Sequence, residues 1–201
     1  MQALYTLDFA TPDSPEMNFC SACGQPVVFR IPPGDDRERY MCEHCETVHY
    51  TNPRVVTGCL ATWEDRVLLC RRAIAPRRGY WTLPAGFLEN GEAADEGALR
   101  ETWEEARARV VIDDLYTVYS LPHISQIYMF YRARLTRPEF AAGEESEDIA
   151  LFREADVPWQ ELAFPVIRET LEHYFHDRSR DSYPVRSSSL IVDPSRRRGW
   201  G

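Results

Sequence analysis

The chain has 201 residues, of which 44% are hydrophobic, 27% charged and 12% aromatic. This composition excludes a disordered chain, a collagen and a coiled coil, and it supplies enough apolar residues for a sizeable core. All 23 basic residues are Arg, which excludes catalysis through a lysine Schiff base. The net charge is -9, and residues 178–201 hold six Arg and two Asp, a net of +4, so residues 1–177 carry -13. An acidic body of this kind repels phosphates, and we expect no nucleic-acid partner.

The sequence has no run approaching the roughly 20 apolar residues of a membrane span. Residues 1–17 also lack the basic start and apolar run of a signal peptide. We therefore expect a cytoplasmic protein that has no membrane partner. Because cytoplasmic thiols stay reduced, the six Cys are expected to be free thiols or metal ligands.

Strands are expected first along the main part of the chain. Two β-rich runs, 54–63 and 66–72, are separated by a short acidic turn and predict a hairpin. A third strand is expected at 80–83, where Pro84 ends it.

The strongest helical pattern runs from Ala93 to about Arg107. Its apolar residues Leu99, Trp103 and Ala106 are expected to anchor the helix on a sheet. Later elements are strands at 110–121, 124–135 and 149–152 and an amphipathic helix at 166–175.

This order of elements predicts an α+β fold with a mixed sheet flanked by helices. We divide the chain into a lead-in at 1–17, a small module at 18–52, a main domain at 53–177, and an Arg-rich tail at 178–201 that we expect to be disordered.

Two Cys-x-x-Cys pairs define the small module. Cys20 and Cys23 are separated by 18 residues from Cys42 and Cys45, a spacing that lets two tight turns bring four thiolates around one Zn²⁺. Redox dithiols or disulfides are the alternatives. Four protein thiolates leave no open position on the metal, so the predicted zinc is structural. The remaining cysteines, Cys59 and Cys70, lie in apolar strands and are expected in the core.

The helix after residue 93 is strongly acidic. Glu101 and Glu105 are four residues apart and Glu104 is adjacent, so like charges gather on one side. A hard divalent cation among these oxygens would relieve the repulsion; a solvated acidic helix is the alternative. Arg100 is placed to pair with Glu92 or Glu96 and to brace the preceding loop.

The spacing Gly86, five residues, Glu92, seven residues, then 100–105 as Arg-Glu-Thr-Trp-Glu-Glu resembles the signature of the Nudix hydrolases, a loop-helix that binds divalent metal and a diphosphate. Residues 79–86 resemble the strand that leads into that signature, and the cysteine pairs resemble the zinc ribbon of one branch of the family. The resemblance covers roughly residues 18–176. It implies a Nudix α/β/α sandwich with a mixed sheet, preceded by a small four-Cys zinc ribbon.

The resemblance also implies the roles of single residues. Glu101, Glu104 and Glu105, with the carbonyl oxygen of Ala85, are expected to hold one to three Mg²⁺ or Mn²⁺ ions. The structural positions of the signature are Gly86, Glu92 and Arg100. The implied reaction is an in-line displacement at phosphorus.

Two positions depart from the family pattern. Arg107 stands where the family has a helix-ending Gly, which is expected to cost about 1 kcal/mol or to extend the helix. Thr102 replaces a large aliphatic residue and is expected only to loosen the packing.

The expected substrate is a nucleoside diphosphate linked to another group. Residues 19–20, Pro53, 68–72 and 83–86 resemble the group of Nudix enzymes that acts on FAD and ADP-ribose, so release of AMP from either compound is favoured. The residues after Ala108 lack the Ser-Gln-Pro-Trp-Pro-Phe-Pro motif of the NADH pyrophosphatases. An NADH pyrophosphatase or a hydrolase of NAD-capped RNA is the alternative within the family.

An acidic loop at 143–148 sits where such enzymes place an extra carboxylate, so Glu145 and Asp148 are candidates for a base or metal ligand. A solvated acidic loop is the alternative. Roles for Arg71, Arg72, Arg77 and Arg78 stay open between phosphate contacts and surface charge, and Tyr128 and Tyr131 are expected in the core.

A different class of function remains open as well. The ribbon and the Arg tail could serve a nucleotide-sensing, nucleic-acid-binding regulator without turnover, although the intact carboxylate set favours an enzyme. A homodimer supported by the zinc ribbon is compatible with the sequence, which shows no interface.

Overall fold

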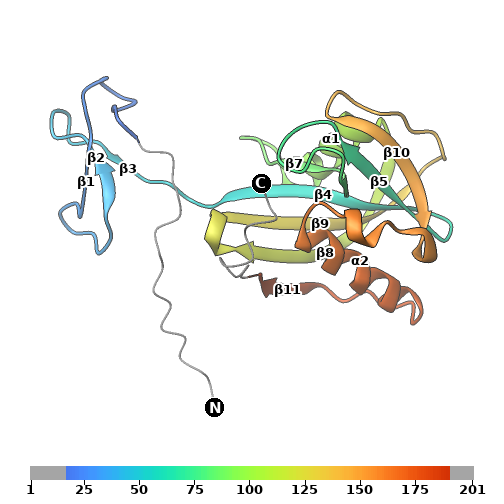
Figure 1. Ribbon diagram of the computed structural model, residues 1–201. Helices are drawn as coiled ribbons and strands as arrows, with labels where there is room; N and C mark the ends of the chain where they lie inside the picture. Colours follow the sequence, from blue (N-terminus) through green and yellow to red (C-terminus); the bar gives the residue numbers. More distant parts are fainter. Residues whose placement is uncertain (1–16, 191–201) are drawn as a thin grey trace, which may run out of the picture. The chain divides into compact units, whose positions relative to one another are not determined.

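The computed structural model describes residues 17–190, so all of the predicted lead-in except Met17 lies outside the described residues. The chain divides between Pro53 and Arg54 into two compact units (Figure 1). None of the helices between residues 17 and 190 is both long and apolar enough to cross a membrane.

The first unit is built on three short antiparallel strands in the order β1 (Val28–Arg30), β2 (Arg39–Met41) and β3 (Val48–His49). Its buried hydrophobic residues, within the part that the structure describes, are Met41 and two of the paired cysteines, Cys20 and Cys42. Such a small apolar core cannot by itself offset the conformational entropy lost on folding. The unit therefore depends on a further source of stability.

The second unit is an eight-stranded mixed sheet with two helices. Along the sheet the strand order is β10, β5, β4, β9, β8, β11, while β6 pairs with β5 and β7 pairs with β4. β4 runs parallel to β9, β8 runs parallel to β11, and the other pairings are antiparallel. The bounds are β4 (Arg54–Trp63), β5 (Arg66–Arg72), β6 (Trp81–Thr82), β7 (Ala85–Phe87), α1 (Ala94–Ala106), β8 (Val110–Leu121), β9 (Gln126–Leu135), β10 (Ser146–Arg153), α2 (Pro165–Arg178) and β11 (Arg186–Ser189).

The two helices lie on opposite faces of the sheet (Figure 1). Leu60 of β4 packs in the hydrophobic cluster that contains Ile167 of α2, whereas the adjacent Cys59 packs in the cluster that contains Ala98 of α1. Because successive side chains of a strand point to opposite faces, this alternation sets one helix on each side. The predicted mixed sheet between helices is confirmed, and Cys59 is a core residue as expected.

The face on which α1 packs differs from the expectation. Leu99 and Trp103 are 38% and 42% exposed, so the prediction that they anchor the helix is wrong. The buried face consists of small or polar residues instead, because α1 approaches β4 closely: a Cβ on Gly97 would lie 2.9 Å from the methyl group of Thr57. The Thr57 hydroxyl also donates to the carbonyl of Ala94 at 2.7 Å. A large side chain on this face would hold the helix away from the strand.

The end of α1 resolves one departure from the family pattern. The helix ends at Ala106, and Arg107 takes the left-handed conformation, with φ of 49°, that glycine usually supplies. Its backbone N–H donates to the carbonyl of Trp103 at 2.9 Å. Arg107 therefore ends the helix at a cost in backbone energy and does not extend it.

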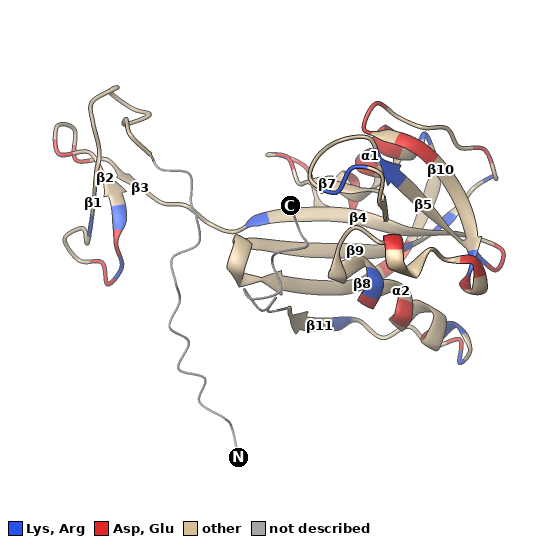
Figure 2. Cartoon of the chain, in the orientation of Figure 1, with Lys and Arg blue, Asp and Glu red and all other residues tan. Residues whose placement is uncertain are grey.

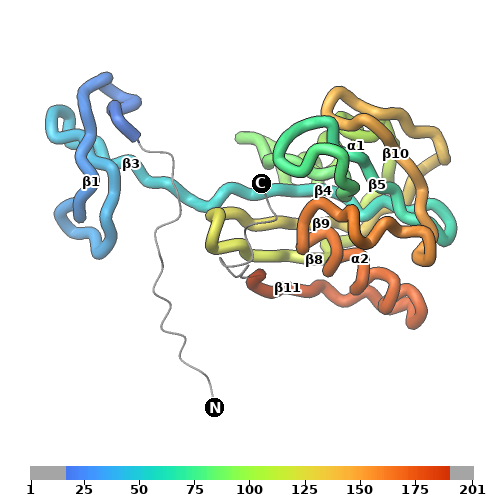
Figure 3. The backbone as a smooth tube through the Cα atoms, in the orientation of Figure 1, coloured from blue at the N-terminus to red at the C-terminus, as the bar shows by residue number. Residues whose placement is uncertain are grey.

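The predicted disorder of the tail is wrong for the residues that the structure describes. Arg186–Ser189 form β11, which pairs with β8 at the edge of the sheet (Figure 3). Asp177 of α2 is 3% exposed and accepts hydrogen bonds from the Tyr116 hydroxyl at 2.8 Å and from the guanidinium of Arg186. This buried network fixes the segment that follows α2. The rest of the predicted tail, 191–201, lies outside the described residues.

We expect Asp177→Asn to lower the free energy of unfolding by about 2 kcal/mol, because an amide cannot replace these charge-assisted bonds. Burial raises the pKa of Asp177, but the bonds from Arg186 and Tyr116 outweigh it and leave the pKa below its usual value. The stabilisation is therefore complete above the pKa of an Asp carboxyl in the unfolded chain, about 4. It is lost as the pH falls through the pKa of Asp177 in the folded protein. Urea unfolding at several pH values measures it.

The control is Asp156→Asn, which changes an exposed carboxyl. Equal urea midpoints for the two variants at pH 7 would contradict the role assigned to Asp177.

Candidate functional sites: a four-thiolate cluster and an acidic loop-helix

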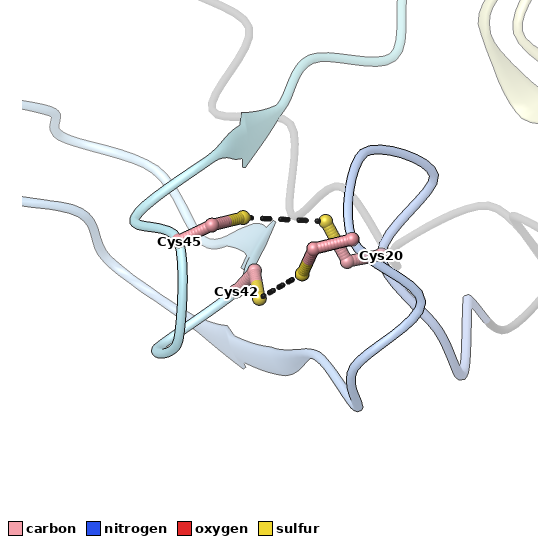
Figure 4. A group of neighbouring side chains, drawn as sticks. Cys20, Cys42 and Cys45 are labelled. Atoms are coloured by element: carbon pink, nitrogen blue, oxygen red, sulfur yellow. Dashed lines mark hydrogen bonds between the residues drawn. The ribbon is translucent and has the colours of Figure 1, made fainter.

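The four paired cysteines converge in the first unit (Figure 4). Their sulfur atoms all lie within 4.8 Å of one another, with Cys20 and Cys45 3.6 Å apart and Cys23 and Cys42 3.5 Å apart. A tetrahedral zinc site with bonds of about 2.3 Å has sulfur-to-sulfur edges of about 3.8 Å. The cluster therefore fits a tetrahedral metal ion closely.

The two turns that carry these cysteines have the same local conformation. Gly24 and Glu46 follow the second cysteine of each pair, and both have positive φ, 73° and 59°. Glycine adopts this conformation without strain, whereas Glu46 adopts it at some cost in energy. Hydrogen bonds from the hydroxyl and the backbone N–H of Thr47 lower the pKa of the Cys45 thiol.

We expect the intact chain to hold one zinc and Cys42→Ser to lose it, because three thiolates no longer close the tetrahedron. Elemental analysis of purified protein should give one zinc per chain for the wild type and for Cys59→Ala, a control that removes a buried thiol outside the cluster. A Cys42→Ser chain that retains one zinc would contradict the assignment.

The second site is the loop-helix, which consists of α1 and the loop that joins it to β7, and Arg100 holds it together. The Arg100 guanidinium donates to both carboxylate oxygens of Glu92, at 3.0 and 2.7 Å, and to the carbonyl of Phe87 at 3.0 Å. Glu92 in turn accepts the backbone N–H of Glu89 at 2.7 Å. The sequence predicted that Arg100 pairs with Glu92 or Glu96 and braces the loop. Arg100 pairs with Glu92, whereas Glu96 accepts the N–H of Ala93 at the start of the helix.

Close backbone approach brings α1 onto β7. A Cβ on Gly86 would lie 2.4 Å from the Glu101 carboxylate, and a Cβ on Gly58 would lie 2.3 Å from the carbonyl oxygen of Pro84. Both positions therefore need glycine. As a result the carboxylates of Glu101 and Glu105 lie against the backbone of β7, where Glu105 accepts the N–H of Ala85 at 3.2 Å.

Burial and like charge control the two inner carboxylates. Glu105 is 6% exposed, and burial, with repulsion from Glu101 and Glu145, raises its pKa to about 8 against the opposing effects of the Ala85 N–H and Arg72. Burial and nearby carboxylates likewise raise the pKa of Glu101, although Arg100 opposes the shift. Ionised carboxylates are thus disfavoured here unless a cation joins them, and oxygen donors suit Mg²⁺ or Mn²⁺.

Glu104 differs from its two neighbours because its side chain is 53% exposed. Arg100 contacts both Glu104, at 3.3 Å, and Glu101, at 2.6 Å. Among residues 17–190 the thiolates are the only set of three or more candidate ligands whose donor atoms all lie within 4.8 Å of one another. The three glutamates share one side of the loop-helix but are not gathered to that distance.

The loop before β10 carries the two remaining candidates, and the structure separates them. Glu145 is exposed and lies within electrostatic reach of both Glu101 and Glu105. Asp148 is exposed and accepts the N–H of Ile149 at 2.8 Å, inside a strand that begins at residue 146 and not at 149 as predicted. Figure 2 shows acidic residues on α1 and at the start of β10.

Sequence reasoning missed two contributors to this site. Gly143 donates to the Glu105 carbonyl at 2.9 Å, and a Cβ there would lie 1.8 Å from the Glu104 carbonyl oxygen, so the loop can approach α1 only at a glycine. Burial raises the pKa of both Glu105 and Tyr128, and the charge of Arg72, which the sequence left unassigned, opposes the rise at both. An isolated glycine in a polar loop signals close approach, whereas nothing local to the sequence distinguishes Arg72 from its neighbours.

Both parts of the chain match known families. Residues 18–51 match the zinc-ribbon family described as Nudix N-terminal, and residues 52–174 match the NUDIX domain family. A crystal structure of a NUDIX hydrolase from Nitrosomonas europaea is 52% identical and has a TM-score of 0.85, with 88% of this chain and 100% of that chain covered. The chain belongs to the Nudix hydrolase family.

Curated relatives are more distant. The NAD-capped RNA hydrolase NudC of Pseudomonas fluorescens (strain Pf0-1) is 30% identical over 176 residues, which cover 85% of this chain and 60% of that protein. The ADP-ribose pyrophosphatase of Methanocaldococcus jannaschii is 29% identical over 121 residues, 57% of this chain and 69% of that protein. The matches to NudC of P. fluorescens and of Edwardsiella ictaluri span 60% and 50% of those proteins.

We expect Glu105→Gln to weaken Mn²⁺ binding at the loop-helix by at least about 10-fold, because the amide supplies no negative charge to the metal. Gln keeps an oxygen that can accept the Ala85 N–H, so the fold should persist. Electron paramagnetic resonance of free Mn²⁺ measures the affinity. The control Glu172→Gln removes an exposed carboxylate from α2, and equal Mn²⁺ affinity in both variants would contradict the prediction.

Proposed function

We propose that this chain is a divalent-metal-dependent pyrophosphohydrolase that cleaves the diphosphate of nucleoside diphosphate-X compounds, with FAD and ADP-ribose as the favoured substrates and AMP as a product. One observation carries the proposal: Glu101 and Glu105 of α1 lie against the β7 backbone, with Glu145 within electrostatic reach and a hydrogen-bond network through Arg100 holding the loop. Membership in the Nudix hydrolase family supports it.

The proposed roles of the residues in the loop-helix follow from their positions. Mg²⁺ or Mn²⁺ ions, when bound, would neutralise the diphosphate and make a coordinated water more acidic. Glu101, Glu104 and Glu105, with the Ala85 carbonyl, are the proposed ligands, because they lie on one loop-helix beside β7. Gly86 leaves room for the Glu101 carboxylate, and Arg100 with Glu92 keeps the loop in one conformation.

Glu145 is the proposed base that removes a proton from the attacking water. It is exposed to solvent and acts on the carboxylates of α1, whereas the side chain of Asp148 already accepts a backbone N–H. The backbone carbonyl of Glu145 accepts the N–H of Ala73 at 2.8 Å, which fixes the loop on the end of β5. Asp148 stays a prediction from the sequence that this geometry does not favour.

The metal of the first unit is proposed to be Zn²⁺ in a structural role, because four thiolates fill a tetrahedral shell. The cytoplasmic location and a homodimer supported by the ribbon stay predictions.

A second candidate is hydrolysis of NAD-capped RNA. It is favoured by the relatives named NAD-capped RNA hydrolase NudC, whose matches cover 85% of this chain. The net charge of -9 disfavours a long RNA partner. FAD, ADP-ribose and the NAD cap share an ADP group, so the two candidates need the same catalytic residues.

We expect purified protein with Mg²⁺ to release AMP from FAD or ADP-ribose, and Glu105→Gln to lower the rate at least about 100-fold, because removing even an outer-shell partner of a metal costs 10- to 100-fold. Mass spectrometry of the products, with FAD, ADP-ribose, NADH and an NAD-capped oligonucleotide in parallel, measures both. Cleavage of the capped oligonucleotide alone would favour the second candidate. Absence of cleavage in a folded, zinc-containing protein would overturn the enzymatic proposal.

A further inference from the structure

A cleft of about 400 Å³ opens at the N-terminal end of α2 in the second unit. Tyr80, just before β6, forms one wall, and the segment from Trp159 to Pro165 forms the other. This volume lies within the range of small-molecule sites, roughly 300 to 1,000 Å³. None of the described lining residues is acidic, and two of them, Arg77 and Arg168, are basic. In a chain of net charge -9, such a lining favours an anionic ligand.

The cleft presents three half-buried aromatic rings, each with a guanidinium over it. The distances from guanidinium carbon to ring centre are 5.2 Å for Arg77 and Tyr80, 5.6 Å for Arg168 and Trp159, and 5.3 Å for Arg72 and Phe164. Planar rings beside cations are the groups that bind a nucleobase by stacking and its phosphate by charge.

Trp159 is held rigidly in this cleft. Its ring meets Phe175 of α2 edge to face, with centroids 6.1 Å apart and planes at 70°. The Arg168 guanidinium donates to the Trp159 carbonyl, and the nearby Ala163 N–H donates to the Trp81 carbonyl of β6 at 2.8 Å. A ring fixed in this way loses little conformational entropy when a ligand stacks on it.

Arg72 connects the cleft with the acidic loop-helix. Its guanidinium lies over Phe164, and its charge also acts on Glu105 and Tyr128. Ala85, Tyr128 and Phe164 all pack against the same hydrophobic cluster of the second unit. Arg72 therefore lies over a ring of the cleft and within electrostatic reach of Glu105 in the acidic loop-helix.

We propose that this cleft binds the adenine base of the substrate and that Trp159 is the ring on which the base stacks, which makes Trp159 a specificity-determining residue. The inference rests on the proposed function, since it takes the nucleoside half of the diphosphate as the occupant. It separates the two products of ADP-ribose cleavage: AMP carries the base that the cleft binds, whereas ribose 5-phosphate has no ring to stack.

The test compares AMP and ribose 5-phosphate binding to the full chain by titration calorimetry. We expect Trp159→Leu to raise the dissociation constant of AMP about 10-fold, as the loss of one base stack does, and to leave that of ribose 5-phosphate unchanged. Trp159→Phe should restore most of the AMP affinity, because it keeps a ring. Trp63→Leu is the matched control, a tryptophan at the end of β4 that lies outside both the cleft and the loop-helix.

The outcomes separate this inference from the proposed function. Unchanged AMP affinity in Trp159→Leu, equal losses for both ligands, or no AMP binding by the wild type would each overturn the inference. AMP release from ADP-ribose with a KM that Trp159→Leu does not change would also overturn it, while the proposed activity would stand. AMP binding that depends on Trp159 in a chain without turnover would support the cleft and remove the enzymatic proposal.

Discussion

The ion pair between Arg100 and Glu92 is the interaction on which the rest of the acidic site depends. Arg100 joins the loop to α1 through both oxygens of Glu92 and the Phe87 carbonyl, and it also contacts Glu101 and Glu104. One cation thus organises several carboxylates that would otherwise repel one another. The loop can then present its backbone and acidic side chains together, which is what binding a divalent cation requires.

A second constraint is steric. Gly58, Gly86 and Gly143 lie where a Cβ would collide with the chain around the loop-helix, so the backbone of β4, β7 and the loop before β10 all approach closely. This closeness buries Glu105 and raises its pKa, and it places Glu145 within electrostatic reach. The strain of gathering like charges is therefore built into the fold, and a bound cation would relieve it.

The two units obtain their stability from different sources. The sheet unit has a hydrophobic cluster on each face, whereas the first unit has few buried apolar residues and four convergent thiolates. A metal ion in the first unit would replace the missing core, because metal binding then contributes directly to the free energy of folding. The acidic site, in contrast, lies on a scaffold that needs no metal to form its packed core.

The sequence alone determined the features that depend on local spacing: the two cysteine pairs, the helix of glutamates with its Arg100 brace, and the strands of the hairpin. Tertiary structure decided which face of α1 is buried, because the near contact of Gly97 with β4 leaves no room for Leu99 or Trp103. Tertiary structure also decided that the segment beginning at Arg186 adds a strand to the sheet. It decided as well that Arg72 lies near both the aromatic cleft and the acidic loop-helix. Those outcomes depend on contacts between residues far apart in the chain, which no local pattern encodes.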